Sequence, residues 1–360
     1  MSRKTARTFA FLTSRKVSIP RAAQLAVCAL AAWLVISCER AKSSPDWQSV
    51  AKDVVAPHAA AKEVAVAFST NEAAVEPISP FSEAPLAGGF RFMTYNVENW
   101  LTMDRYVDRK NLKGAPKPDS EKSAVISIIT RHSPDIIGLS EIGTVADLAE
   151  IQQKLKAAGL DLPHSHHTGG SDAVRHLGIL SRFPIIATSK PATMDYKLDG
   201  KAFSISRGIL DATIVVQEKS QRFIGVHLKS KRETDHGDQS AMRLNEARLL
   251  RRHIDSIFAS DANARIIVYG DLNDTRATPA IKAITGRYNS PTYLTAIPAK
   301  DSAQNAWTHH WALHDIYSRI DYVMVSPAMK PDVVFSAAKL IDDPDWSQAS
   351  DHRAILAVFR

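Results

Sequence analysis

Gly270-Asp271-Leu272-Asn273 directly follows the apolar run Ile266-Ile267-Val268-Tyr269. The change from apolar to polar residues at this point indicates the end of a strand. A short apolar run of this composition is typical of a buried strand. Glycine lets the backbone turn, and the alternation of side chains along extended backbone places Asp271 and Asn273 on the same side. A carboxylate and a carboxamide held together there suit the polarisation of a water molecule and the binding of a phosphate oxygen. The same four residues also fit a plain turn, so the rest of the chain must decide between the two readings.

Periodic apolar residues predict alternating strands and helices before this motif. Apolar residues at helical spacing, such as Val125, Ile128 and Ile129, predict an amphipathic helix. Two strand–helix units in succession favour an α/β fold. The predicted elements are strand 90–95, helix 120–132 with Ser120 as its cap, buried strand 135–139 and helix 144–158.

The second half of the chain predicts further strands around one long helix. We expect strands 177–181 and 185–188 to be paired, and strands 209–216 and 223–228 to be joined by a hairpin turn at 218–220, all antiparallel. The other predicted elements are helix 240–258 and strands 266–269, 320–325, 333–337 and 354–359. Segments 99–119, 160–175 and 276–315 match no motif and are expected to form the loops that choose the substrate.

Composition and charge place the chain among ordinary globular proteins. It has 360 residues, of which 45% are hydrophobic and 23% are charged, and its formal net charge is +7. The first 37 residues contain six basic residues and no acid, so the remainder carries a formal charge of only +1. The overall basicity is therefore no argument for nucleic-acid binding.

The N-terminus is typical of an export signal. A basic region up to Arg21 precedes an apolar run over residues 22–36, which is shorter than the roughly 20 residues of a membrane span. Val35-Ile36-Ser37-Cys38 is similar to a bacterial lipobox, in which Cys38 would be lipidated. The alternative is a short uncleaved anchor. Both alternatives place the domain outside the cytoplasm, in the cell envelope.

These features predict three segments. Residues 1–37 form a lipoprotein signal peptide, residues 38–88 form a flexible linker rich in Ala, Ser, Pro, Glu and Lys, and residues 89–360 form one domain. Because Cys28 lies within the signal, the mature chain would keep only Cys38. It would therefore have no internal disulfide despite export.

Polar residues recur where the predicted strands end or begin. Such positions converge on one edge of an α/β sheet, and ligands bind there. Each residue alone has a simpler explanation: Asn96 as an Asx-turn, Glu141 as a helix-start acid, and Asp321 as half of a surface ion pair with Arg319. So many coincidences favour a shared site. Its members are Asn96, Glu141, His227, Asp271, Asn273, Asp321, Asp351 and His352.

The ordered set of motifs resembles the endonuclease/exonuclease/phosphatase superfamily, the DNase I-like proteins, over about residues 90–360. The resemblance implies an α/β fold: a four-layer α/β/β/α sandwich of two packed mixed sheets flanked by helices, with the active site at one edge of the sheets. The motifs are Thr94-Tyr95-Asn96, Ser140-Glu141, Gly178-Ile179-Leu180-Ser181-Arg182, Ser206-Arg207-Gly208, Gly225-Val226-His227-Leu228, Gly270-Asp271-Leu272-Asn273, Arg319-Ile320-Asp321-Tyr322 and Ser350-Asp351-His352.

The resemblance also implies roles. Asn96, Glu141 and Asp351 would hold Mg²⁺ or Mn²⁺, which prefer hard oxygen ligands. The catalytic residues would be His227, Asp271, Asn273, Asp321 and His352; Asp321 would fix the tautomer of a histidine, and the identity of the general base stays open. Predicted substrate contacts are Arg207, Lys229, Trp307 and His309, although Arg207 could equally form a surface ion pair and Lys229 could be a solvated charge.

The predicted function is that of a metal-dependent phosphoester hydrolase, of the phosphodiesterase or nuclease type, acting as a membrane-anchored monomer. Its substrate would be a nucleic acid, a nucleotide, or a lipid or sugar phosphate. The alternatives are a phosphomonoesterase and a non-catalytic binding module on the same fold. Two histidine groups could suggest zinc, but they lack cysteine and the usual spacing, so we expect rim loops instead: His164, His166 and His167, and His309, His310 and His314.

Overall fold

The computed structural model describes residues 89–107, 109–232, 235 and 237–360. The predicted signal peptide 1–37, the lipidation site Cys38 and the linker up to residue 88 lie outside the described residues. Within the described part, none of the helices combines the length and apolarity needed to cross a bilayer.

Two six-stranded sheets form the centre of the domain, and both contain parallel and antiparallel pairs. The first sheet has the order β17 (Lys339–Leu340), β18 (Ile355–Phe359), β1 (Phe90–Trp100), β4 (Ile136–Ile142), β6 (His176–Ser181) and β5 (His164–Thr168). The second has the order β13 (Thr295–Ala296), β16 (Asp321–Val325), β12 (Ile266–Asp271), β11 (Lys219–His227), β10 (Ile209–Val216) and β7 (Ile185–Thr188).

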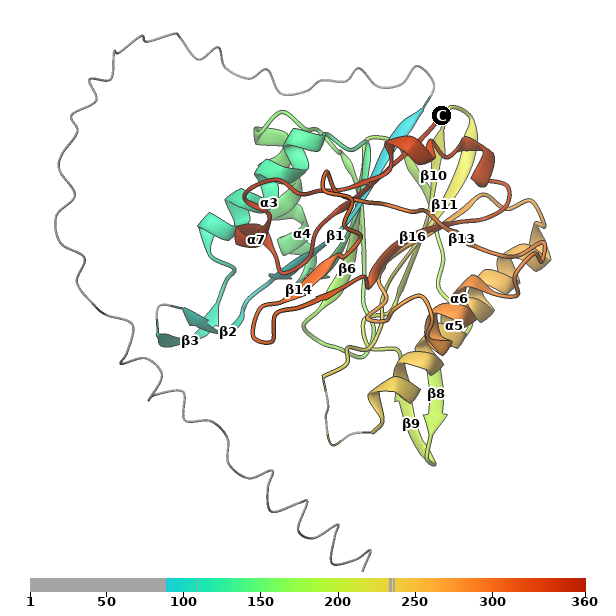
Figure 1. Cartoon of the computed structure of the whole chain (residues 1–360), viewed down its shortest axis with the longest axis horizontal. Coiled ribbons are helices and arrows are strands. Elements are labelled where there is room, and N and C mark those ends of the chain that lie inside the picture. Colours follow the sequence, from blue (N-terminus) through green and yellow to red (C-terminus); the bar gives the residue numbers. More distant parts are fainter. Residues whose placement is uncertain (1–88, 108, 233–234, 236) are drawn as a thin grey trace, which may run out of the picture. The chain divides into compact units, whose positions relative to one another are not determined.

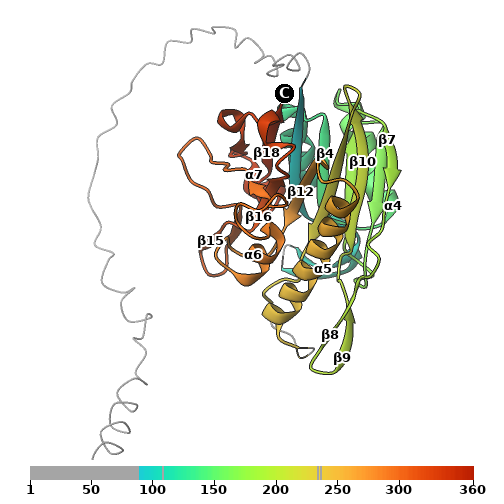
Figure 2. The same cartoon turned by 90° about the vertical axis from the view of Figure 1, so that its right-hand side faces the viewer.

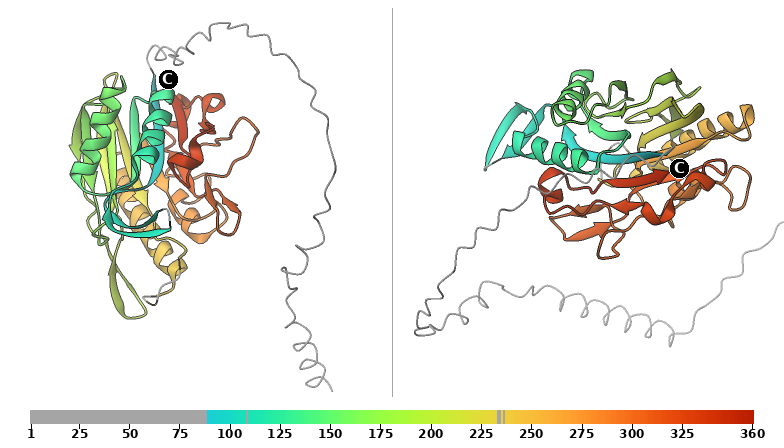
Figure 3. Two further views of the ribbon diagram at one scale, coloured as in Figure 1. Left: turned by 90° about the vertical axis from the view of Figure 1, so that its left-hand side faces the viewer. Right: turned by 90° about the horizontal axis from the view of Figure 1, so that it is seen from above.

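Helices cover the outer face of each sheet, which gives four layers (Figure 1). Helices α3 (Asp119–His132) and α4 (Val145–Ala157) lie on the first sheet, as the left view of Figure 3 shows. Helices α5 (Gln239–Ser260) and α6 (Pro279–Thr285) lie on the second (Figure 2). Three separate apolar clusters fill the spaces between these layers, so the predicted four-layer α/β/β/α sandwich is confirmed.

The remaining elements connect or extend the layers. The hairpins β2–β3 and β8–β9 project from the sandwich in Figure 1, and β14–β15 lies near the strand ends. These elements are β2 (Met103–Val107), β3 (Lys110–Ala115), β8 (Asp195–Leu198), β9 (Lys201–Ser204), β14 (His309–Trp311), β15 (Ile316–Ser318), the short helix α7 (Trp346–Ala349), and the 3-10 helices η1 (Lys330–Asp332) and η2 (Phe335–Ala337).

Tyr269 packs between the two sheets next to the central motif. Its ring lies 4.9 Å from the ring of Phe92 in the first sheet, measured between centroids. A Cβ atom on Gly138 would lie 2.0 Å from the Tyr269 ring, and one on Gly225 would lie 2.6 Å from its hydroxyl. Glycine at both positions therefore lets the sheets approach each other beside the strand ends.

The predicted helices and most predicted strands are confirmed, with small shifts at their ends. Helix α4 begins after Thr144, whose hydroxyl accepts a hydrogen bond from the Asp147 N–H. Helix α3 instead begins at Asp119 after Pro118, without a side-chain cap, so Ser120 is not the cap. The hairpin turn lies at Gln217 and Glu218, which both have positive φ and match the right-handed twist of the flanking strands.

Three predictions about strands were wrong. Segments 177–181 and 185–188 do not pair, because the chain crosses between the sheets at Pro184 and each strand joins a different sheet. Segment 333–337 is not a strand, since its backbone forms 3-10 turns, although Val333 makes one bridge to Phe359. All three segments expected to form loops contain strands, since 99–119 contains β2 and β3, 160–175 contains β5, and 276–315 contains β13 and β14.

A buried charge cluster ties α5 to β10, and it predicts acid-dependent stability. Asp211 is 1% exposed and accepts hydrogen bonds from Arg222 Nε at 2.8 Å and from His253 Nε2 at 2.6 Å. Burial raises the pKa of Asp211, but the hydrogen bonds from His253 and Arg222 outweigh it and lower the pKa below its usual range. The stabilisation is therefore present above the unfolded-state pKa of about 3.9 and is lost as the pH falls through the lower folded-state value.

Asp211→Asn should destabilise the protein by about 3–5 kcal/mol at neutral pH, because it leaves the Arg222 guanidinium and the His253 ring without their carboxylate partner. The loss should shrink as the pH falls below about 4, because the carboxylate of the unfolded wild-type chain takes up a proton before that of the folded chain does. Urea unfolding across a pH series measures this. Asp255→Asn, which alters an exposed partner of Arg251, is the control. An equal loss at pH 3 and pH 7 would contradict the charge-based explanation.

Candidate active site

Three polar side chains lie in one row across the second sheet. In the register of the strands, His227 at the end of β11 is opposite Asp271 at the end of β12, and Asp271 is opposite Asp321 at the start of β16. All three are at most 4% exposed. Parallel pairing of β11 with β12 and antiparallel pairing of β12 with β16 bring two strand ends and one strand start to the same edge.

The first sheet supplies the facing half of the site. Asn96 in the central strand β1 is opposite Ser140 of β4, so Glu141 follows at the same edge. On the other side of β1, the segment before β18 is fixed by Ser350, whose hydroxyl donates to the Asn96 carbonyl at 2.8 Å and accepts from the His352 N–H at 3.0 Å. The two packed sheets thus bring residues from distant parts of the chain to one edge.

Asn96 lies at the centre of the site. Its Nδ2 donates to Asp271 Oδ2 at 3.2 Å and to Glu141 Oε1 at 3.4 Å, and it lies 3.4 Å from His352 Nε2. Its Oδ1 accepts from the Glu98 N–H at 3.1 Å. This single side chain therefore contacts residues of both sheets, and the structure brings together Asn96, Glu141, Asp271 and His352.

Left-handed backbone conformations cluster around these residues. Glu98, Asn99, Glu141 and Asn273 all have φ between 46° and 63°. This conformation is uncommon for residues other than glycine, and for glutamate it is held only by surrounding contacts. The pairing register of β4 is irregular at Glu141, and this bulge directs its carboxylate so that Oε2 accepts from the Asn99 N–H at 3.0 Å.

Asp271 is a buried carboxylate with an elevated proton affinity. Burial raises its pKa to about 7, with a further contribution from the neighbouring Asp321. Asn273 holds it from two sides, through its backbone N–H to Oδ1 at 2.8 Å and through Nδ2 to Oδ2 at 3.3 Å. Asp271 and Asn273 thus lie on the same side, as their spacing in the sequence predicts. A positioned carboxylate of this kind can accept a proton from water.

The two histidines of the site differ in charge. Burial lowers the pKa of His352, but the carboxylates of Asp321 and Asp271 outweigh it and raise the pKa well above its ordinary value. His352 Nδ1 donates to Asp321 Oδ2 at 2.8 Å. His227 is fully buried, and this burial, together with the charge of Arg207, lowers its pKa well below the ordinary value. His352 is therefore a cationic donor, whereas His227 is neutral, with Nε2 3.4 Å from Asp271 Oδ2.

If this site is catalytic, Asp321→Asn should lower kcat by roughly 10- to 100-fold with little change in KM, because Asp321 contacts His352 Nδ1 and so orients that ring. It should also lower the pKa of His352, since the nearest carboxylate is removed. NMR titration of the His352 ring measures that pKa separately from activity. If the His352 pKa stayed unchanged, the pairing would not have the effect that we assign to it.

The four residues predicted to contact the substrate differ in their surroundings, and three of them contact other parts of the protein. Arg207 is 8% exposed, with Nε 3.4 Å from Asp172 Oδ2, and its Nε and Nη1 have no hydrogen-bond partner among the described residues. Lys229 follows His227 by two residues, and its N–H donates to Glu246. Trp307 lies under the Arg353 guanidinium, 3.4 Å from it, and packs against other aromatic rings.

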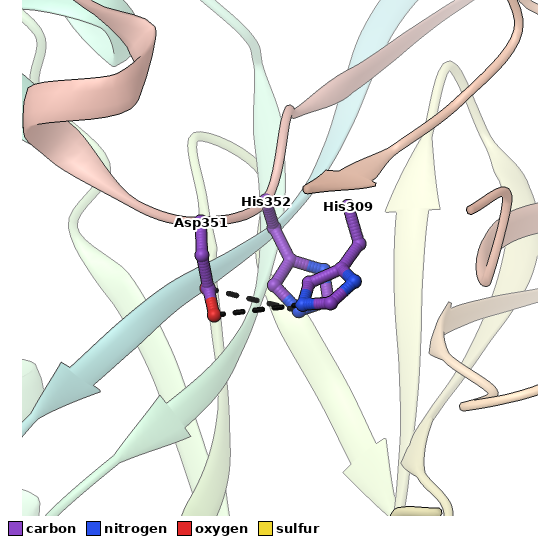
Figure 4. Close-up of side chains that lie close together, drawn as sticks. All are labelled: His309, Asp351 and His352. Carbon is purple, nitrogen blue, oxygen red and sulfur yellow. Dashed lines mark ion pairs between the residues drawn. The ribbon is translucent and has the colours of Figure 1, made fainter. Parts of the chain in front are cut away.

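His309 lies directly beside the site. Its ring centroid is 4.6 Å from that of His352, and its Nε2 is 3.6 Å from Asp351 Oδ2 (Figure 4). Asp351 contacts the site from the same side, with Oδ1 3.9 Å from His352 Nε2. His310, the next histidine of the group His309, His310 and His314, lies apart from the site, because it pairs with Asp315 and stacks on Tyr317.

The oxygen donors of the site fit a hard divalent cation. Burial, the neighbouring Asp351 carboxylate and, more weakly, Glu141 raise the pKa of Glu98, which reaches about 7. The charge of Lys117 lowers the pKa of Glu98. The hydrogen bond of Lys117 Nζ, however, goes to the backbone carbonyl of Glu98, at 3.0 Å, and not to its carboxylate. A cation among these carboxylates and the Asn96 amide would relieve the repulsion, and oxygen ligands of this kind suit Mg²⁺ or Mn²⁺.

Three residues that build the site were not among the predicted site residues, although Ser350 belongs to the motif Ser350-Asp351-His352. Glu98 accepts from the Asp351 N–H through Oε2 at 3.1 Å, and Ser350 links β1 to His352. Thr308 is fully buried, and its Oγ1 accepts from the N–H groups of Ile320 and Asp321, both at 3.0 Å, which fixes the start of β16. Proximity to Asn96 in the sequence could have indicated Glu98, whereas no local pattern marks Thr308.

Solved structures that share this fold include three from different organisms. An endonuclease/exonuclease/phosphatase family protein from Leptotrichia buccalis has 16% identity, covering 75% of this chain and 99% of that chain with a TM-score of 0.52. Truncated TDP2 from Caenorhabditis elegans has 17% identity, covering 76% and 98% with a TM-score of 0.51. Sphingomyelinase C from Streptomyces griseocarneus has 15% identity, covering 76% and 99% with a TM-score of 0.51.

Comparison of the sequence alone gives the family. A search of curated proteins found no match for this chain. The sequence model of the Endonuclease/Exonuclease/phosphatase family matches residues 93–352, which include every predicted site residue from Asn96 to His352. By this match over most of its length, the chain belongs to the endonuclease/exonuclease/phosphatase family.

Proposed function

We propose that this protein is a divalent-metal-dependent phosphoester hydrolase, of the phosphodiesterase or nuclease type, that acts in the cell envelope. The observation that carries the proposal is the contact of Asn96 with Asp271, Glu141 and His352. One small site thus combines a carboxylate with an elevated pKa, a cationic imidazole and a set of oxygen ligands. These are the parts that hydrolysis of a phosphate ester by water requires.

Asp271 is the proposed general base. Its Oδ2 is held by the amides of Asn96 and Asn273, at the edge where both sheets end. It orients a water molecule and accepts its proton as the water oxygen bonds to phosphorus and the bond from phosphorus to the leaving oxygen breaks. General-base catalysis of this kind contributes roughly 10²–10⁴-fold to rate.

His352 and Asn273 are proposed to bind the phosphate. His352 directs Nε2–H toward the site, because Asp321 holds its Nδ1. It donates to a non-bridging oxygen and stabilises the negative charge that builds there. Neutral His227 lies next to Asp271 and is placed to contact the phosphate or the leaving group.

Asn96, Glu141 and Asp351 are the proposed holders of Mg²⁺ or Mn²⁺, with Glu98 beside them. When bound, such an ion polarises the phosphate and neutralises charge in the transition state. Arg207 and Lys229 are proposed to draw the phosphate group toward the site. The almost neutral charge of the chain beyond residue 37 favours local contacts of this kind over broad electrostatic attraction of DNA.

The envelope location is supported by the sequence of residues 1–38 alone. The basic stretch, the apolar run and the small residue before Cys38 favour export and lipid anchoring. Labelling with a radioactive fatty acid measures this, with Cys38→Ser as the variant that should lose the label. Incorporation into the serine variant would overturn the proposed anchor.

Hydrolysis is tested with the purified full chain and Mg²⁺ or Mn²⁺. The substrates are bis-nitrophenyl phosphate, nitrophenyl phosphate and plasmid DNA, each with and without EDTA. We expect metal-dependent cleavage of a diester that EDTA abolishes. Cleavage of the monoester alone would make the protein a phosphomonoesterase, and three intact substrates with either metal would favour a non-catalytic binding module.

A further inference from the structure

Two imidazoles and a carboxylate meet at the outer rim of the site. The ligand atoms of His309, Asp351 and His352 all lie within 4.8 Å of one another (Figure 4). The His309 Nε2 to Asp351 Oδ2 distance is 3.6 Å, and the His352 Nε2 to Asp351 Oδ1 distance is 3.9 Å. Ligands at about 2.0–2.2 Å from a tetrahedral zinc ion lie roughly 3.3–3.6 Å apart, so small side-chain movements would close the set.

The backbone holds the two imidazoles side by side. His309 of β14 and His352 form an antiparallel bridge. Hydrogen bonds flank it on both sides, from the His310 N–H to the Asp351 carbonyl at 3.0 Å and from the Arg353 N–H to the Thr308 carbonyl at 2.7 Å. The proximity of the rings is thus built into the pairing of two segments 43 positions apart in the sequence.

His352 is also oriented for coordination. Its Nδ1 donates to Asp321 Oδ2 at 2.8 Å, which leaves Nε2 directed toward Asp351 and His309. Metal-binding histidines commonly donate their second N–H to a carboxylate, which fixes the ring and makes the coordinating nitrogen more basic. The His309 side chain is 21% exposed and that of Asp351 is 43% exposed, so an ion could enter from solvent.

We propose that His309, Asp351 and His352 form a binding site for a transition-metal cation of the Zn²⁺ type. Two nitrogen ligands and one carboxylate oxygen suit such an ion, whereas Mg²⁺ prefers the oxygen donors around Asn96 and Glu141. The two sites share Asp351 and differ in His309. Three protein ligands would leave a fourth position for water.

The site has a consequence for catalysis that rests on the proposed function. Binding of an ion to His352 Nε2 releases the proton of that nitrogen to solvent, and this N–H would otherwise donate to the phosphate. A transition-metal ion at this site should therefore inhibit hydrolysis supported by Mg²⁺, and His309 should set the sensitivity.

Metal binding is tested without any substrate. The purified full chain is titrated with Co²⁺, whose visible absorption reports nitrogen and oxygen ligation, and with Zn²⁺ in competition with a chromogenic chelator. Wild type is compared with His309→Ala and His309→Asn. His310→Ala is the matched control, because His310 is adjacent but contacts Asp315 and Tyr317. Cys28 and Cys38 are unchanged in all variants, so any metal ion that binds to them contributes equally to each titration.

We expect both His309 variants to bind Zn²⁺ at least roughly 10- to 100-fold more weakly than wild type and to lose the Co²⁺ absorption, since they lack a ligand. His310→Ala should bind like wild type. Thermal unfolding of the metal-free proteins identifies any variant that does not fold. If His309→Ala does not fold, His309→Asn is used for the comparison. Equal Zn²⁺ affinity in wild type and a folded His309 variant would overturn the site.

The inhibition is measured separately on whichever ester the protein cleaves. In excess Mg²⁺, added Zn²⁺ should inhibit wild type and His310→Ala at concentrations at least tenfold below those needed for the His309 variants. Equal inhibition of all variants would overturn the role of His309. If the protein cleaves no ester, the proposed function fails, while the Co²⁺ and Zn²⁺ titrations still decide the site.

Discussion

Asp271→Asn should lower kcat for phosphoester hydrolysis by roughly 10²–10⁴-fold, which is the contribution of a positioned general base. Asparagine has nearly the same shape and keeps one oxygen to accept from the Asn273 N–H, but it cannot take a proton from water. The Asp271 carboxylate has its pKa raised to about 7 by burial and by Asp321, so in the wild type it accepts that proton readily.

Steady-state kinetics on the diester measures this loss, and extra metal should not restore the rate. The control is Asp255→Asn, since Asp255 pairs with Arg251 on the exposed side of α5. Thermal unfolding shows whether both variants stay folded. A folded Asp271→Asn protein that keeps more than a tenth of the wild-type kcat would remove Asp271 from the role of base.

Glu141→Gln should lower the rate at a fixed, low Mg²⁺ concentration by roughly 10²–10³-fold. Glutamine still accepts the hydrogen bond from the Asn99 N–H, but it removes one negative charge from the carboxylates around Asn96. Because ligand charge sets the affinity for a hard cation, the Mg²⁺ concentration for half-maximal rate should increase.

A Mg²⁺ titration of the rate therefore separates the two predictions. Glu141→Gln should recover a large part of the wild-type rate at high Mg²⁺, whereas Asp271→Asn should not. Glu218→Gln, in the exposed turn between β10 and β11, is the control for loss of an acid. An unchanged Mg²⁺ requirement in Glu141→Gln would show that Glu141 does not hold the ion.

The positions of the polar residues in the sequence anticipated the geometry of the site well. Asn96, Glu141 and Asp271 each stand where a predicted strand ends, and the structure places the carboxylates of Glu141 and Asp271 within hydrogen-bond distance of the Asn96 side chain. This works because a buried strand must be apolar along its length, so the first polar residues mark its end. Strand ends in an α/β sheet then converge.

The sequence was less informative where pairing partners are distant. Strands 177–181 and 185–188 were expected to pair because they are adjacent in the chain, yet the chain changes sheets at Pro184. The histidine group His309, His310 and His314 was judged as a local cluster, whereas the structure separates His310 and brings His309 to His352 instead.

The amino-acid sequence by itself determined the α/β class, the helices and most strands, and the residues that end those strands, because periodicity and polarity act between neighbours in the chain. Only the tertiary structure decided that His352 is cationic while His227 is neutral, and that Glu98 and Thr308 support the site. Protonation and contact depend on burial and on charges brought from distant segments. These are set when the two sheets pack, and no local pattern encodes them.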